Sequence, residues 1–245
     1  MRNRVPRVLL ALGLLLPWVI VAKGEERHKA AEKEEPAKTA ELLKVDLRSN
    51  LTRWGLKPRK QGARGTCSVF VVTGAFEYAL SRRLKHGAPL SAEFLNWACN
   101  QITGNKKDVG QFFHNLLKGF EQYGICLEEH MPYQPQFDPF LEPTPRAIRN
   151  AKQIRTKGFK VHWINPWSPK LGLTDQHFEQ IRKTLDKGWP VCAGSHHSVL
   201  LVGYEDDGRQ PGGGRFMAED SGMGGFRELT YEFVKANMAD VFWVE

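Results

Sequence analysis

This chain of 245 residues has few cysteines, no internal repeat and none of the usual metal-binding patterns. Its four cysteines never occur as C-x-x-C, and its histidines never occur as H-x-x-x-H. Those spacings are typical of zinc sites, whereas the adjacent His196 and His197 are poorly spaced to hold one metal ion from a strand. We therefore predict no metal site and no cofactor.

A strong positive charge is also lacking once the first segment is set aside. The formal net charge is +8, but residues 1–24 contain four basic residues and no acidic one, which leaves +4 for the remainder. A surplus of that size, scattered along the chain, does not indicate nucleic-acid binding. Nucleic acid is therefore not an expected partner.

Residues 1–24 have the composition of a secretory signal peptide. Three arginines in the first seven residues precede an apolar run from Val8 to Ala22, which ends at a small-x-small cleavage site. A run of about fifteen residues that contains Pro17 is short for a membrane-spanning helix. We expect cleavage, no stable membrane span afterwards, and a secreted or periplasmic (extracytoplasmic) location; an uncleaved signal anchor is the alternative.

Residues 25–43 are rich in Glu, Lys and Ala and contain no aromatic residue. They predict a charged spacer, either an exposed helix or a disordered segment, because they have little apolar surface to bury. About 200 residues follow, enough for one domain with a substantial core or for two small lobes. We assign residues 44–245 to that domain.

The domain is organised around the stretch from Gln61 to Phe70 and the apolar run that follows it. Apolar residues recur at helical spacing from Val69 to Leu84 and also fill the other sides, which predicts a helix buried nearly all round. Thr66 suits the N-cap, so Cys67 would lie in the first turn beside unpaired backbone N–H groups. A thiolate there has a lowered pKa and is nucleophilic; a buried, inert cysteine is the alternative.

Gln61 stands six residues before Cys67. Gly62 and Gly65 allow the loop between them to fold back tightly, so the Gln61 amide could join the Cys67 N–H in an oxyanion hole. This spacing resembles the papain-like cysteine peptidases, whose active-site loop reads Q-G-x-x-G-x-C and runs into the central helix.

Further patterns place other elements along the domain. Ser91 suits the N-cap of a short helix, and an apolar stripe from Phe112 to Phe120 predicts another helix. We also predict helices over residues 147–152 and 178–185, and strands over residues 158–164, 189–193, 197–204 and 215–219.

The last two of these strands predict an antiparallel hairpin that carries a base. Their pairing sets His197 and Asp220 roughly opposite each other at the open end of the hairpin. That geometry suits an imidazole oriented by a carboxylate, with its other ring nitrogen facing a nucleophile. Strand alternation points His196 to the opposite face.

The segment from Ser198 to Tyr204 resembles the papain-like signature H-[AS]-V-L-x-V-G-Y around the catalytic histidine. The third triad residue of that family is an asparagine, and here Asp220 stands in its place. Because aspartate can orient the ring as asparagine does, we expect Asp220→Asn to preserve appreciable activity. By resemblance, Gly110 would line the cleft, where a glycine lets substrate backbone come close; an ordinary loop glycine is the alternative.

The resemblance spans roughly residues 45–245 and implies an α+β, two-lobed fold. A helical lobe would carry the nucleophile at the head of its central helix, and an antiparallel β-rich lobe would carry the base. It also implies a monomeric cysteine-type endopeptidase that acts on peptide or protein substrates through a thioester intermediate, with catalytic residues Cys67, His197, Asp220 and Gln61. The alternatives are a catalytically silent module that binds peptides or a partner, and an amidase or acyl-transferase with the same triad.

Four features depart from the family pattern. Ser68 replaces an aromatic residue after the nucleophile, Arg64 occupies the position of a disulfide cysteine, and Gly222 replaces a tryptophan after the third triad residue. Only residues 194–196 separate two strands that the family joins by some tens of residues. The missing loop normally forms a wall on the leaving-group side of the cleft, so we expect slow turnover and loose selection there.

The remaining cysteines also limit the possible disulfides. With Cys67 assigned to catalysis, at most one disulfide can form, and its pairing stays open among Cys99, Cys126 and Cys192.

Overall fold

The computed structural model describes residues 43–245 of the chain. The predicted signal peptide and the predicted spacer, apart from its last residue Leu43, lie outside the described residues. Within residues 43–245, no helix has the length and apolar character needed to cross a membrane.

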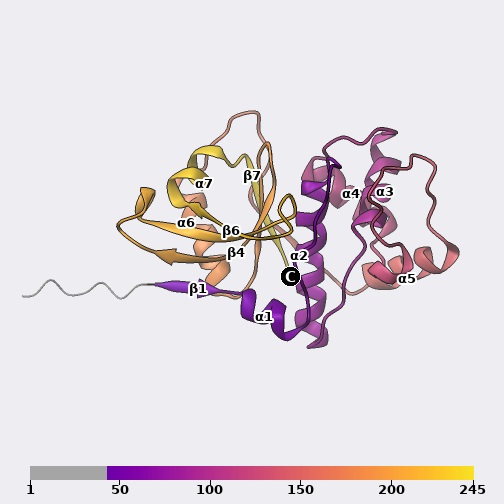
Figure 1. Ribbon diagram of the computed structural model, residues 1–245, viewed down its shortest axis with the longest axis horizontal. Helices are drawn as coiled ribbons and strands as arrows, with labels where there is room; N and C mark the ends of the chain where they lie inside the picture. The colour runs from indigo at the N-terminus through magenta and orange to yellow at the C-terminus, as the bar shows by residue number, and fades with distance from the viewer. Residues whose placement is uncertain (1–42) are drawn as a thin grey trace, which may run out of the picture. The chain divides into compact units, whose positions relative to one another are not determined.

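The helical part of the fold surrounds α2, an 18-residue helix that runs from Cys67 to Leu84. Figure 1 shows the sheet on one side of α2 and α3, α4 and α5 on the other. The helices and 3-10 turn of this part are α1 (Arg48–Arg53), α3 (Ala92–Thr103), α4 (Phe113–Tyr123), η1 (Glu128–His130) and α5 (Pro145–Arg155).

The other part is a seven-stranded antiparallel sheet with the order β2-β7-β3-β4-β5-β6, in which β1 pairs with β4. Its strands are β1 (Lys44–Asp46), β2 (Val161–Asn165), β3 (Val191–Gly194), β4 (Val199–Asp206), β5 (Gly214–Asp220), β6 (Gly225–Thr230) and β7 (Asp240–Val244). Helices α6 (Asp175–Asp186) and α7 (Tyr231–Asn237) and the 3-10 turn η2 (Pro211–Gly213) belong to this part. A helical lobe beside an antiparallel β lobe is the α+β architecture that the sequence predicted.

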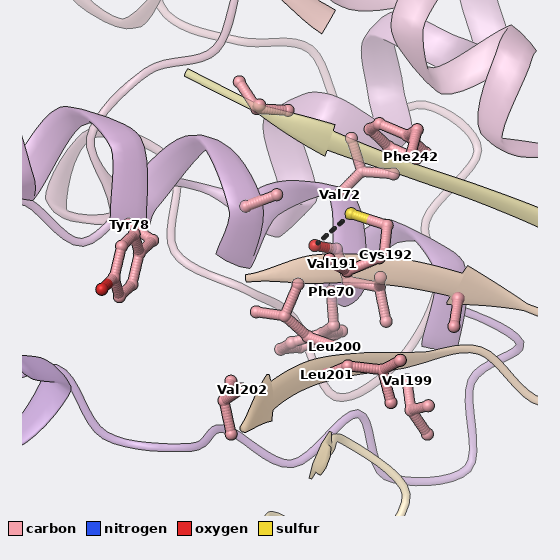
Figure 2. Packing of buried hydrophobic residues seen from close by; sticks show 14 of the residues in the cluster. Phe70, Val72, Tyr78, Val191, Cys192, Val199, Leu200, Leu201, Val202 and Phe242 are labelled. Carbon is pink, nitrogen blue, oxygen red and sulfur yellow. Dashed lines mark hydrogen bonds between the residues drawn. The ribbon is translucent and has the colours of Figure 1, made fainter. Parts of the chain in front are cut away.

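Burial holds α2 in a helical conformation although part of its sequence has low helix propensity. The run Val71-Val72-Thr73-Gly74 combines β-branched residues with glycine, which favour helix weakly. In Figure 2, Phe70 and Val72 pack among strand residues that include Val191 and Phe242. The Cys192 thiol also lies 3.7 Å from the carbonyl oxygen of Val71. Each such fully buried apolar side chain contributes about 1.5–3 kcal/mol, which outweighs the propensity deficit.

Most of the predicted elements are present, with shifted ends. Ser91 caps α3 as expected, because its hydroxyl accepts the backbone N–H of Phe94 at 2.9 Å. The glycine that follows α4, Gly124, has a φ of 84°. A side chain there would also meet the backbone of Ala151, so only glycine fits. Residues 225–245, for which no sequence pattern predicted an element, contain β6, α7 and β7.

The hairpin differs from its prediction at its first residue. β4 begins at Val199 and not at His197, because residues 195–197 form a bend between β3 and β4. In the register of the hairpin, Leu200 pairs with Glu219, and Asp220 is the last residue of β5. His197 therefore precedes the strand, and only its ring reaches toward Asp220.

Candidate active site

Cys67 is the first residue of α2 and is half-buried. Thr66 occupies the N-cap position as predicted, but its hydroxyl makes no capping bond within the described residues. It lies instead 2.7 Å from the hydroxyl of Tyr133. The backbone N–H groups at the start of α2 are therefore left for an anionic group at Cys67.

The thiol of Cys67 ionises more readily than an ordinary cysteine. Burial opposes ionisation, but hydrogen bonds from His197 and from the backbone N–H groups of Ser198 and Ser68 outweigh it, so the pKa of Cys67 is lowered. The other three cysteines are buried and chemically different: burial raises the pKa of Cys99 and of Cys126 to about 12 and that of Cys192 well above its usual value. All four cysteines are free, and no disulfide forms within residues 43–245.

His197 connects Cys67 to a carboxylate. Its Nε2 lies 2.7 Å from Oδ1 of Asp220, so Nδ1 is the ring nitrogen that remains for another partner. The hydrogen bond with Cys67 and the proximity of Asp220 outweigh partial burial and raise the pKa of His197 to about 9. Both pKa shifts favour the thiolate form of Cys67 and the imidazolium form of His197.

Asp220 is buried and accepts three hydrogen bonds. Its Oδ1 accepts Nε2 of His197 at 2.7 Å and the backbone N–H of Gly222 at 2.8 Å. Its Oδ2 accepts Nη1 of Arg227 at 3.1 Å. Burial opposes ionisation, but these donors outweigh it and lower the pKa of Asp220. Arg227 lies on β6 opposite Ala218 and was not predicted, because no local pattern marks a single arginine in a strand.

Gln61 joins the active-site loop to the β lobe. Its backbone N–H donates to the carbonyl of Ser221 at 2.8 Å, and its Oε1 accepts the Ser221 hydroxyl at 2.8 Å. Its Nε2 donates one hydrogen to the carbonyl of Arg64 at 2.7 Å, so the second hydrogen remains for another acceptor. Tyr133 spans the loop, because its hydroxyl contacts both Thr66 and the carbonyl of Gln61.

Gly110 lies beside the same loop. A Cβ at Gly65 would come within 3.2 Å of the backbone nitrogen of Gly110, so the two glycines allow their segments to approach closely. An added Cβ at Gly110 would reach one described atom, the carbonyl oxygen of Gly65, at 4.0 Å. The position is consistent with a cleft, and a role in substrate binding stays a prediction.

A cavity of about 320 Å³ is lined by His196 and Ser198, the neighbours of His197, and by residues from both lobes. One of its lining residues is a carboxylate that no sequence pattern marked. Asp240 pairs with Gly194 across β7 and β3, and a Cβ at Gly194 would fall 1.9 Å from Oδ1 of Asp240. Burial raises the pKa of Asp240 to about 6. The cavity is lined by Gln111, Phe112, Phe113, Trp167, Ser168, Pro169, Leu171, Gly194, Ser195, His196, Ser198, Ala239 and Asp240.

Comparison with solved structures identifies the fold. Xylellain, a cysteine protease from Xylella fastidiosa, superposes with a TM-score of 0.62 at 17% identity, over 82% of this chain and 85% of that chain. Digestive procathepsin L 3 from the larval midgut of Tenebrio molitor gives a TM-score of 0.56 at 18% identity, over 85% of this chain and 71% of that chain.

Sequence comparison finds a distant relative. A peptidase C1-like protein of Acanthamoeba polyphaga mimivirus is 21% identical over 237 residues, covering 81% of this chain and 73% of that protein. No protein-family profile matches the chain. The resemblance to papain-like cysteine peptidases is confirmed at the level of structure: the described residues adopt the papain-like cysteine protease fold.

Proposed function

We propose that residues 44–245 form a cysteine-type endopeptidase that hydrolyses peptide bonds through a thioester intermediate. The observation that carries the proposal is that His197, whose Nε2 lies 2.7 Å from Oδ1 of Asp220, also lowers the pKa of Cys67, so that one imidazole connects the first turn of α2 to the end of the β4–β5 hairpin. A nucleophile, a base and a group that orients the base are the elements of covalent acyl transfer.

The mechanism follows from the charges at the site. The Cys67 thiolate attacks the peptide carbonyl carbon, and the developing oxyanion accepts hydrogen bonds from the Cys67 N–H and Nε2 of Gln61. The His197 imidazolium gives its proton to the leaving amine as the C–N bond breaks. The neutral imidazole then takes a proton from water, whose oxygen attacks the thioester. The C–S bond breaks, and thiolate and imidazolium re-form.

The substrate is proposed to be an extended peptide that passes Gly110 and places one side chain in the 320 Å³ cavity. Asp240 lines that cavity, and burial raises its pKa to about 6. The cavity would therefore favour a basic side chain above that pH. We further propose that the enzyme is a monomer with no cofactor, and that cleavage after residue 24 releases it as a secreted or periplasmic protein.

Labelling of the full chain with an epoxide inhibitor of cysteine peptidases tests the proposal. One label at Cys67, together with hydrolysis of a mixed peptide library, is the expected result. No label would indicate a silent binding module. A label without peptide hydrolysis would indicate an amidase or acyl-transferase. The buried Cys99 and Cys126 provide internal controls, because their raised pKa values of about 12 keep them unreactive.

A further inference from the structure

Asp220 differs from a simple hydrogen-bond acceptor because each of its carboxylate oxygens is held by a different group. Oδ1 faces His197 and the Gly222 N–H, while Oδ2 faces Nη1 of Arg227. The Asp220 side chain is 4% exposed, whereas that of Arg227 is 44% exposed. The arginine thus fixes the rotation of a buried carboxylate from its solvent side.

An asparagine at position 220 does not satisfy the same set of donors. If its oxygen took the place of Oδ1, its NH₂ group would face the guanidinium of Arg227, which has donors only. If the amide were turned over, the NH₂ group would face His197 and the N–H of Gly222. Either orientation leaves at least one buried donor without an acceptor, which is destabilising.

We propose that Arg227 is a positioning residue of this site: by holding Oδ2 of Asp220, it directs Oδ1 at His197 and makes an acidic residue obligatory at position 220. This inference reverses the expectation that Asp220→Asn preserves activity. It rests on the proposed function only where hydrolysis is measured, because the reactivity of Cys67 toward an alkylating agent depends on the same three groups without any substrate.

A charge effect accompanies the positioning. Cys67 and Asp220 are the ionisable groups in direct contact with His197, and Arg227 is the cation that compensates Asp220. The neighbouring His196 lines the adjoining cavity. Removal of the Arg227 charge leaves the negative charge of Asp220 uncompensated, which stabilises imidazolium. The pKa of His197 should then rise by about half a pH unit, as is typical of partly exposed charges.

The test is a mutant cycle on the full chain with Asp220→Asn, Arg227→Gln and the double variant. In the double variant, the glutamine oxygen can accept the asparagine NH₂ group, so the lost acceptor is restored. We expect Asp220→Asn to lower the alkylation rate of Cys67 by iodoacetate, and peptide hydrolysis, by about tenfold or more. The double variant should recover most of that loss, and Arg227→Lys should stay within about threefold of the parent.

The pH profile of alkylation supplies a readout that a purely structural role would not change. Iodoacetate is an anion. With increasing pH, the rate at which it alkylates Cys67 therefore rises as the thiolate forms and falls as the His197 imidazolium deprotonates near pH 9. In Arg227→Gln, the alkaline limb should move up by about half a pH unit. The matched control is Arg215→Gln on β5, because Arg215 pairs with Glu205 and Glu228 instead. This control should leave the profile unchanged.

Two results would overturn the inference: additive losses in the double variant, or an alkaline limb that does not move in Arg227→Gln. If Asp220→Asn does not fold, the alkaline limb of the alkylation profile in Arg227→Gln decides the test alone. Because Arg227 is partly exposed, we expect that variant to fold. If the double variant recovers the alkylation rate but the parent hydrolyses no peptide, this inference holds and the proposed function is rejected. If the parent hydrolyses peptides but the losses in the double variant are additive, the proposed function holds and this inference is rejected.

Discussion

Arg64 and Glu93 form an ion pair that is almost completely removed from solvent, with side chains 2% and 4% exposed. Nη2 of Arg64 donates to Oε1 of Glu93 at 3.2 Å, and Nη1 donates to Oε2 at 2.5 Å. Arg64 belongs to the active-site loop and Glu93 to the first turn of α3, so the pair fastens the loop to the helical lobe. Asp108, in the segment before Gly110, lies 3.6 Å from Nε of the same arginine. Arg64 stands where the family resemblance implies one cysteine of a disulfide, so an ion pair holds the loop at this position.

The first prediction concerns this ion pair. Arg64→Met should lower the free energy of unfolding by about 3–5 kcal/mol, because Glu93 is then left as a buried, unpaired charge. The double variant Arg64→Met, Glu93→Leu should recover part of the loss, since two apolar residues need no partner. Urea denaturation measures both values. A loss below 1 kcal/mol in the single variant would show that water compensates the carboxylate.

Reducing agents provide a control for that experiment. Because all four cysteines are free within residues 43–245, a reductant should leave the urea midpoint of the parent unchanged. A lower midpoint under reduction would mean that a disulfide stabilises the protein in solution.

The second prediction concerns the nucleophile. Cys67→Ala should abolish peptide hydrolysis and leave the melting temperature near that of the parent, because Cys67 is only half-buried. Cys126→Ala is the matched control, since its thiol lies in a separate buried cluster with Phe94 and Met131. The control should keep parental hydrolysis. Comparable hydrolysis by Cys67→Ala and the parent would reject the peptidase mechanism.

The third prediction concerns folding stability as a function of pH. Burial raises the pKa of Glu77 to about 7 and that of Asp240 to about 6. Both pKa values lie above those of the unfolded chain, so the folded state holds protons that the unfolded chain releases. Stability from these groups is therefore present at about pH 4 and is lost as the pH rises to about 7.

Thermal unfolding between pH 4.5 and 7 measures this dependence. Asp240→Asn should flatten the decline, because the asparagine does not titrate. Asp175→Asn is the control: Lys235 lowers the pKa of this exposed carboxylate, so its titration lies below the window. An unchanged slope in Asp240→Asn would show that Asp240 is solvated and titrates normally.

The fourth prediction concerns the leaving-group side of the cleft. The link between β3 and β4 is a short bend, and Gly222 places no side chain beside the His197–Asp220 pair. Without a wall or a shield, water reaches the His197 ring, whose side chain is 38% exposed, and weakens its electrostatic coupling. We expect slow turnover and little selection for residues after the cleaved bond, measured by profiling cleaved peptides from a mixed library. Strong selection would implicate another segment, with residues 132–145 as the first suspect.

Short-range patterns in the sequence predicted α2 to α6, the position of Cys67 at the start of α2 and the helical cap at Ser91, but not α1 or α7. Periodic burial predicted α2, and the loop before it placed Cys67 in its first turn, because both depend on residues within a few turns of one another. The hairpin that carries His197 and Asp220 was also predictable, since strand pairing across a short loop leaves few registers. Its exact start was not, because the bend at residues 195–197 has no strong local signal.

Tertiary structure alone decided which distant groups support the site. The bond between Gln61 and Ser221 joins residues 160 positions apart, and the Arg64–Glu93 pair joins residues 29 positions apart. Arg227 reaches Asp220 only because β6 pairs with β5, and Asp240 reaches Gly194 only because β7 enters the sheet beside β3. A charge in a sequence has no preferred partner until packing excludes water around it and leaves one counter-charge within reach.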